Sequence, residues 1–189
     1  MNIDQLKGVA SKGKGFASAN QYFVQLPPVQ GYNTNDLNIL CTNVNLPGRQ
    51  IMTQERLIGL KARKMPNGFA SDDINLTFHV MNDYSIRKYF EAWQNEVINQ
   101  DTFEIGYANN YTKQVIIQQS KKGMAFDFPI DKIFGLNIDL DIITSESIIY
   151  TCILKDAFPT TMNTIEFSDE QDGLVKLNVQ LSYTNWTSK

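Results

Sequence analysis

Residues 174–186 read LVKLNVQLSYTNW, and apolar and polar side chains alternate along this stretch. Successive side chains of a strand point to opposite sides, so this pattern predicts a long strand with one apolar and one polar face. The apolar side chains are Val175, Leu177, Val179, Leu181 and Tyr183. The polar face is uncharged beyond Lys176, as expected of a sheet with one packed face and one wet face.

The same alternation occurs in other parts of the chain. It is clearest at 73–81, where Ile74, Leu76 and Phe78 share a face with Val80. A strand beginning at Tyr22 is expected to stop at the prolines that follow Leu26, because proline cannot donate to a strand ladder. The remaining predicted strands are one that begins at Leu37 and ends before the turn at 46–48, and the ranges 111–119, 137–142, 147–155 and 164–168.

One amphipathic helix is predicted after the strand at 73–81. Asn82 or Asp83 is suited to cap its N-terminus, and apolar residues then recur at spacings of four, three and four. These residues are Ile86, Phe90, Trp93 and Val97. Strands outnumber helices and no βαβ alternation occurs, so we expect an antiparallel sandwich or barrel that carries this helix, as a single domain over 1–189.

Composition limits the possible functions. The 189 residues have a formal charge of −3 and one histidine, which disfavours a basic nucleic-acid surface and a histidine-rich metal site. Cys41 and Cys152 do not suggest a disulfide framework. We expect no secretory signal in residues 1–16 and no membrane helix, since no apolar run approaches about 18 residues. Residues 1–18, small, polar and rich in glycine, are predicted to form a flexible arm.

Residues 46–72 do not fit a simple sandwich. Turn signals flank the segment at 46–48 and 65–68. Between them the sequence has five basic residues and one acidic residue, Glu55. Apolar residues without a clear period are interleaved with these charges. Structureless connections of such length are uncommon in a compact domain. We predict a hairpin-like arm that buries its apolar residues on another subunit.

Two acidic stretches, 127–146 and 166–172, are candidate receivers of this arm. We hypothesise that the basic arm of one copy meets an acidic face of the next, and the alternative is that all these charges are solvated loop charges. The candidate interface residues are Arg49, Ile51, Arg56, Leu57, Ile58, Lys61, Arg63, Lys64, Asp139, Asp141, Asp169, Glu170 and Asp172.

The sequence offers little for catalysis. It contains no nucleophile elbow, zinc-protease, redox-cysteine or P-loop motif. The carboxylates of Asp139 and Asp141 are better explained as a solvated strand face, and His79 as a surface or interface residue. We therefore expect no enzyme activity, no cofactor and no metal.

Several stretches in order resemble the tail tube protein family of contractile-tailed bacteriophages. They are 20–24 (NQYFV), 45–48 (NLPG), 76–83 (LTFHVMND), 90–94 (FEAWQ), 154–160 (LKDAFPT) and 177–186 (LNVQLSYTNW). The strand–helix junction at Met81, the helix tryptophan Trp93 and a Phe-Pro-Thr turn at 158–160 are the more specific points. The N-terminal arm and residues 121–146 depart from the family pattern.

The resemblance implies a subunit that forms six-membered rings with a continuous inner β-barrel. The rings would stack into a hollow tube in the virion tail, inside a contractile sheath, after assembly in the host cytoplasm. The implied partners are further copies of the chain, the sheath protein, a baseplate tube initiator and a tape-measure protein in the lumen. DNA would pass through without specific binding, and the subunit itself would not insert into a membrane.

Three other interpretations stay open at this point. A tube-initiating baseplate protein of the same fold would form one ring, which the divergent residues 121–146 would allow. A monomeric β-sandwich binding module would need a concave aromatic cluster, whereas Phe78, Phe90, Trp93 and Tyr183 fall on expected core faces. An enzyme would depend on His79, the single histidine.

Overall fold

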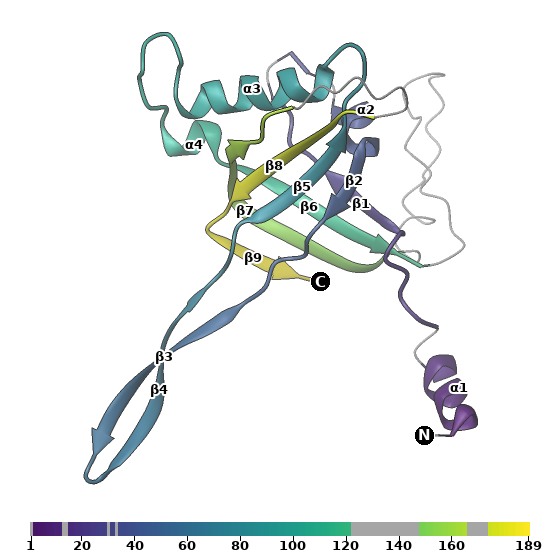
Figure 1. Ribbon diagram of the computed structural model, residues 1–189, viewed down its shortest axis with the longest axis vertical. Coiled ribbons are helices and arrows are strands. Elements are labelled where there is room, and N and C mark those ends of the chain that lie inside the picture. The colour runs from purple at the N-terminus through teal and green to yellow at the C-terminus, as the bar shows by residue number, and fades with distance from the viewer. Residues whose placement is uncertain (1, 13–14, 30, 33, 122–147, 166–173) are drawn as a thin grey trace. The chain divides into compact units, whose positions relative to one another are not determined.

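The computed structural model describes residues 2–12, 15–29, 31–32, 34–121, 148–165 and 174–189. This part of the chain is mainly β, as predicted, with antiparallel strand pairing. The elements are α1 (Ile3–Lys12), β1 (Tyr22–Gln25), α2 (Thr34–Ile39), β2 (Cys41–Val44), β3 (Gln50–Ile58), β4 (Lys61–Ala70), β5 (Ile74–His79), α3 (Ser85–Val97), α4 (Ala108–Tyr111), β6 (Lys113–Ser120), β7 (Ile148–Met162), β8 (Lys176–Ser182) and β9 (Asn185–Ser188) (Figure 1).

The chain divides into two compact units, residues 1–23 with 118–151 and residues 24–117 with 152–189. The single-domain expectation stays a prediction. The strands follow the order β1-β6-β7-β8-β5-β2, with β9 paired to β7, while β3 and β4 form a separate two-stranded sheet. In the first unit, Ser120 donates its backbone N–H to Gln21 across 3.0 Å.

The long strand β7 pairs with different partners along its length. Cys152 to Lys155 pair with β9, and Phe158 to Met162 pair with β8. Between these two stretches Asp156 has φ 54°, a left-handed conformation that interrupts regular extension. The predicted turn at 158–160 is wrong: these residues continue β7, with a register irregularity between Pro159 and Thr161. That irregularity accommodates a proline within a strand.

Helix α3 is the predicted amphipathic helix, and it packs by its aromatic side chains. Tyr89, Phe90 and Trp93 are fully buried, and the Phe90 ring lies 5.4 Å from that of Phe78 on β5. The Tyr89 hydroxyl donates to the carbonyl of Pro27 at 2.6 Å. These contacts confirm that the predicted apolar face of the helix belongs to the core.

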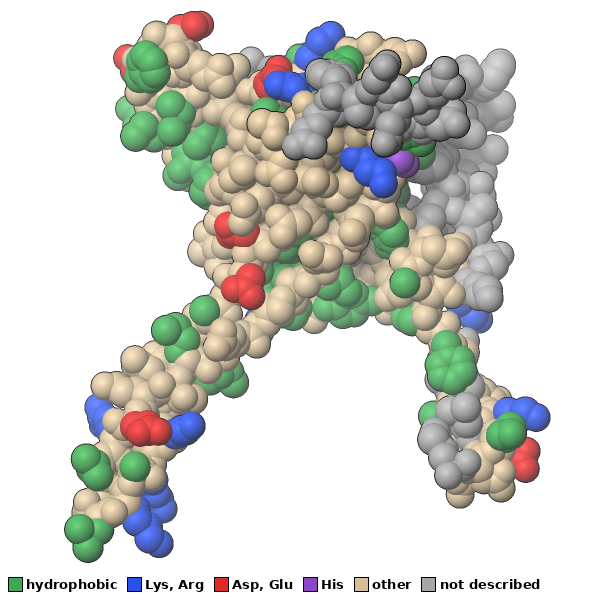
Figure 2. Space-filling view, viewed as in Figure 1, with side chains coloured by type: hydrophobic (Ala, Val, Ile, Leu, Met, Phe, Trp, Pro, Cys, Tyr) green, Lys and Arg blue, Asp and Glu red, His purple; other side chains and the backbone are tan. Residues whose placement is uncertain are grey.

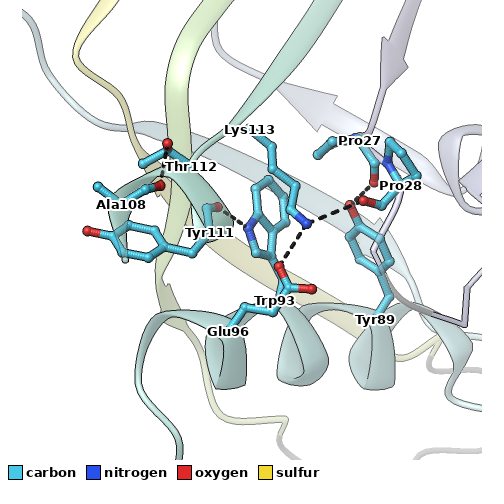
Figure 3. A network of polar contacts seen from close by, with 9 residues as sticks. All are labelled: Pro27, Pro28, Tyr89, Trp93, Glu96, Ala108, Tyr111, Thr112 and Lys113. Atoms are coloured by element: carbon cyan, nitrogen blue, oxygen red, sulfur yellow. Dashed lines mark hydrogen bonds and ion pairs between the residues drawn. The ribbon is translucent and has the colours of Figure 1, made fainter. Parts of the chain in front are cut away.

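Two polar contacts fix α3 against the segment that follows it (Figure 3). The Trp93 indole N–H donates to the Tyr111 carbonyl at 2.8 Å, and Lys113 forms a 2.7 Å ion pair with Glu96. The N-cap prediction was wrong in position, because Tyr84, at φ 55°, precedes the first helical residue. The Asp83 carboxylate still accepts the Ser85 N–H at 3.1 Å.

The strand predicted from Leu37 to the turn at 46–48 is confirmed only in its second part: Thr34–Ile39 is helix α2, and the short strand β2 follows. A strand would place Leu37 and Ile39 on one face, but Leu37 is 3% exposed and Ile39 is 56% exposed. The buried side chain of Asn38 holds α2 against the residues after β1, because its oxygen accepts the Leu26 N–H at 2.8 Å. Helices α1, α2 and α4 were not predicted; α1 lies in the expected N-terminal arm.

The predicted closing strand is two strands, β8 and β9, separated by Tyr183 and Thr184. The Thr184 N–H donates to the Lys155 carbonyl at 3.1 Å. This bond lies between the stretch of β7 that pairs with β9 and the stretch that pairs with β8. The alternation along β8 is as expected, with Leu177, Val179 and Leu181 buried. The predicted strand at 137–142 and the divergent region, except residue 121, lie outside the described residues. At 164–168, Thr164 and Ile165 are not in a strand and the rest lies outside them.

Gly106 sits where the loop after α3 folds back on the helix. Its N–H donates to the Val97 carbonyl at 2.9 Å, and a Cβ here would collide with the backbone carbonyl of Glu96. We expect Gly106→Ala to lower the free energy of unfolding by about 1–3 kcal/mol, because rigid backbone must shift to admit the methyl group. Urea titration would measure this loss. Gly68→Ala is the matched control, since its Cβ would meet nothing within 4 Å; equal losses for both variants would contradict the explanation.

Candidate assembly surface

The residues predicted to form an arm make a two-stranded antiparallel hairpin, β3–β4. Its strands are paired from Gln50–Ala70 to Ile58–Lys61, leaving Gly59 and Leu60 as a two-residue turn. Gly59 has φ 66°, as a tight hairpin turn with glycine at its first position requires. The predicted turn at 65–68 is wrong: Met65, Pro66 and Gly68 pair with β3, and a bulge lies between Met52 and Thr53.

Almost every side chain of this hairpin is exposed. Burial begins only at Ala70, and the two leucines near the turn are the most exposed of the hairpin's large apolar side chains. Leu57 is 81% exposed and Leu60 is 104% exposed. An isolated two-stranded hairpin is at best marginally stable in water. Burying one such side chain in a partner would contribute about 1.5–3 kcal/mol.

The charges of the hairpin are divided unequally between its two faces. Glu55 lies opposite Lys64, a pair of opposite sign, but Arg56 lies directly opposite Arg63. Like charges in directly opposed positions destabilise a strand pair. Lys61 pairs with Ile58, which follows Arg56 by two positions in β3. Because alternate residues of a strand share a face, Lys61 lies on the same face as the two arginines. This face therefore carries three cations and no acid. Lys and Arg side chains are visible at the end of the hairpin in Figure 2.

Arg49 has a different role from the other predicted basic residues. Its guanidinium lies 4.9 Å from the ring centre of Trp186 on β9 and 5.7 Å from that of Phe69 on β4. Such cation–π contacts are attractive and favour a defined side-chain position. Arg49 therefore links the base of the hairpin to the body of the same unit. Ile51, paired with Phe69, is 64% exposed.

The predicted acidic receivers are not described by the structure. Asp139, Asp141, Asp169, Glu170 and Asp172 lie outside the described residues, so their meeting with the hairpin stays a prediction. The sequence analysis missed other exposed acids, Asp101 and Glu104, in the loop between α3 and α4. No periodicity marked them, because they lie in DTFEI at 101–105, which belongs to no predicted element.

The described residues contain no group of three histidine, cysteine or acidic side chains that could hold a metal ion. His79 is half-buried on β5, where it pairs with Lys176 of β8. Burial raises the pKa of Cys41 to about 12 and that of Cys152 to about 11, which keeps both thiols protonated at neutral pH. None of the helices among the described residues is long and apolar enough to span a membrane.

A family model described as phage tail tube protein matches residues 16–189. The chain belongs to the phage tail tube protein family. It is a structural subunit of the virion tail, and the resemblance stated from the sequence is confirmed. A search of curated protein sequences finds no match.

Solved structures with this fold come from contractile injection systems. The anti-feeding prophage tube-terminating cap aligns with a TM-score of 0.61 at 13% identity, covering 92% of this chain and 91% of the cap protein. A chain of the sheath–tube complex of an extracellular contractile injection system, PVC, aligns with a TM-score of 0.59 at 15% identity, covering 100% and 98%. These likenesses give this tail tube protein the fold of tube and cap proteins.

Proposed function

We propose that six copies of this chain form a ring whose strands join into one continuous inner barrel, and that rings stack into a hollow tube within a contractile sheath. The exposed β3–β4 hairpin, in a chain of the tail tube family, is the observation that carries this proposal. The apolar residues of the hairpin are exposed, and one of its faces carries three cations. A partner would bury these apolar residues and neutralise the cations.

The strands at the two ends of the sheet order support ring closure. Among the described strands, β2 pairs only with β5, and β1 pairs only with β6. Each therefore lies at an end of the described strand order, which is the edge that a neighbouring copy would have to join. Joining the edges of neighbouring copies would remove them, as closure of a barrel does.

The polar face of β2, β5 and β8 is suited to line the conduit. The Thr77 hydroxyl donates to the Asn178 side chain at 2.8 Å, and Thr42 donates to the Thr77 carbonyl at 3.2 Å. These hydroxyl and amide groups are largely engaged with one another and are uncharged. DNA binding gains most from cations that neutralise phosphates, and Lys176 is the one cation among the described residues of this face, so such a wall would let DNA pass with little attraction.

Further partners follow from the same proposal. A tape-measure protein would occupy the lumen before DNA passes, and the sheath protein and a baseplate initiator would contact the tube from outside and below. The solved relatives named in a sheath–tube complex and as a tube-terminating cap support sheath association and an ordered tube end. Assembly would take place in the host cytoplasm.

Negative-stain electron microscopy of the purified chain, across protein and salt concentrations and with light-scattering mass, tests the proposal. We expect hollow rings that stack into long tubes. Isolated rings that never stack would favour the alternative of a tube initiator. A 21.5 kDa particle under every condition would contradict self-assembly and favour a monomeric binding module.

A further inference from the structure

An apolar hollow of about 480 Å³ lies between the C-terminal end of α3 and strand β7. Val97, Ile98 and Phe103 line it on the helix side, and Phe158 and Pro159 line it on the strand side. The ring of Tyr111, the last residue of α4, packs edge-on against Phe158 at 5.4 Å and supports this wall. Apolar side chains gather on the surface over the α3–α4 loop (Figure 2).

The loop that borders the hollow is firmly held. Asn99 accepts the N–H groups of Asp101 and Thr102 on its side chain, at 2.9 and 3.2 Å, and that of Phe103 on its carbonyl, at 2.8 Å. Phe103 has φ 57°, a conformation that residues other than glycine rarely adopt. The 80% exposure of Phe103 is therefore imposed by a fixed backbone.

Uncharged residues line the hollow, and the loop that contributes Phe103 to it carries acids. Residues 94–112 contain Glu96, Asp101 and Glu104 and no lysine or arginine. Glu96 is paired with Lys113, but among the described residues Asp101 and Glu104 take part in no ion pair. An apolar hollow with two unpaired acids beside it is complementary to a segment that is both apolar and basic.

The end of the β3–β4 hairpin is such a segment. It presents Leu60 in its turn, next to a face with the cations of Arg56, Lys61 and Arg63, while Leu57 lies on the other face. The hairpin does not use this hollow in its own chain, because its side chains near the turn are all exposed. Eight residue steps separate Gln50 from Ile58, which corresponds to a reach of about 27 Å from the hairpin base.

We propose that the hairpin end of one copy seats in the α3–β7 hollow of a second copy, with Leu60 in the apolar part and the basic residues against Asp101 and Glu104. This rests on the proposed assembly of copies and names the receiving surface. This receiving surface differs from the acidic stretches expected from the sequence. It also gives a function to the exposed Phe103, which a fixed loop holds in place.

Cysteine cross-linking in assembled protein tests the seating directly. Leu60→Cys and Phe103→Cys are introduced together, assembly is imaged, and the sample is oxidised with copper phenanthroline and run on a non-reducing gel. We expect a ladder extending beyond the dimer, because every copy has one donor and one receiver. Either cysteine alone should give at most a dimer. Leu60→Cys with Leu174→Cys, a 75% exposed position elsewhere, is the matched pair and should give no ladder.

The outcomes separate this inference from the proposed function. Tubes without a ladder above the controls would overturn the seating and leave tube assembly intact. Absence of rings and tubes for the unmodified chain as well would overturn both. If tubes form without a ladder and Phe103→Ser prevents sheath co-sedimentation, the hollow receives the sheath protein, which also overturns the inference.

A charge exchange gives a second measurement that does not depend on cysteine geometry. Asp101→Lys with Glu104→Lys should reduce pelletable protein at least tenfold, and Arg56→Glu with Lys61→Glu and Arg63→Glu should do the same. Combined, the two sets should restore pelleting at low salt, because the attraction is re-formed with opposite signs. These positions are exposed, and thermal unfolding would verify that each variant folds. Failure of the combination to restore assembly would overturn the seating.

Discussion

Replacing Arg56, Lys61 and Arg63 together with glutamate is expected to leave the protein as single subunits under conditions where the unmodified chain forms tubes. The three cations share one face of the hairpin, and Arg56 opposes Arg63 with no acid between them. Reversal preserves repulsion within the hairpin, because two glutamates then face each other. The effect on assembly therefore reports contact with a partner. Sedimentation and light scattering measure it, and we expect at least a tenfold loss of pelletable protein.

The matched control reverses three basic residues elsewhere. Lys155, Lys176 and Lys189 are exposed, and their replacement with glutamate changes the net charge by the same amount. If the contact is electrostatic, added salt should also weaken assembly of the unmodified chain, because ions screen exposed charges. Unchanged assembly of the hairpin variant at every salt concentration, or equal losses in both triple variants, would show that the hairpin cations are not an interface.

Trp93→Ala is expected to cost about 3–5 kcal/mol of the free energy of unfolding, the largest stability loss of any change described above. Trp93 is fully buried, stacks near the ring of Phe90 at 6.3 Å and donates its indole N–H to the Tyr111 carbonyl. Truncation leaves a cavity and an unpaired carbonyl. The total free energy of unfolding of a small domain is about 5–15 kcal/mol, so the variant should be close to unfolding at about 37 °C.

Chemical denaturation of unassembled subunits would measure this loss. The matched control is Trp186→Ala, because Trp186 is half-buried on β9 and packs against Arg49 rather than inside the core. We expect a distinctly smaller loss for the control. Similar losses for the two tryptophans would contradict the central position of Trp93 in the core.

The regular part of the fold could be predicted from side-chain alternation and the failures have local causes. β5 and α3 were predicted because each buries one face. Of the strand expected from Leu37 to the turn at 46–48 only β2 formed, because the residues before it form a helix that buries Leu37 and exposes Ile39, a local change that the alternation does not record. The break between β8 and β9 left no signal either, since apolar residues continue in phase through Tyr183.

The residue types of the candidate site could be predicted from the sequence, but the pairing register of its two strands could not. Its basic and apolar residues indicated an exposed arm, and the arm is the β3–β4 hairpin. The opposition of Arg56 and Arg63 could not be derived, because it depends on the turn at Gly59 and on the bulge beside Met52. Phe103 was missed because a loop with an exposed aromatic has no periodicity to detect.

The positions of the two tryptophans allow assembly to be followed by the intrinsic fluorescence of the chain. Trp93 is sealed in the core, so its emission should stay constant while the fold is intact. Trp186 lies under the guanidinium of Arg49 at the hairpin base, where its fluorescence depends on whether that cation stays stacked. A change in emission during assembly, lost in Trp186→Phe, would follow movement of the hairpin base in real time without a label.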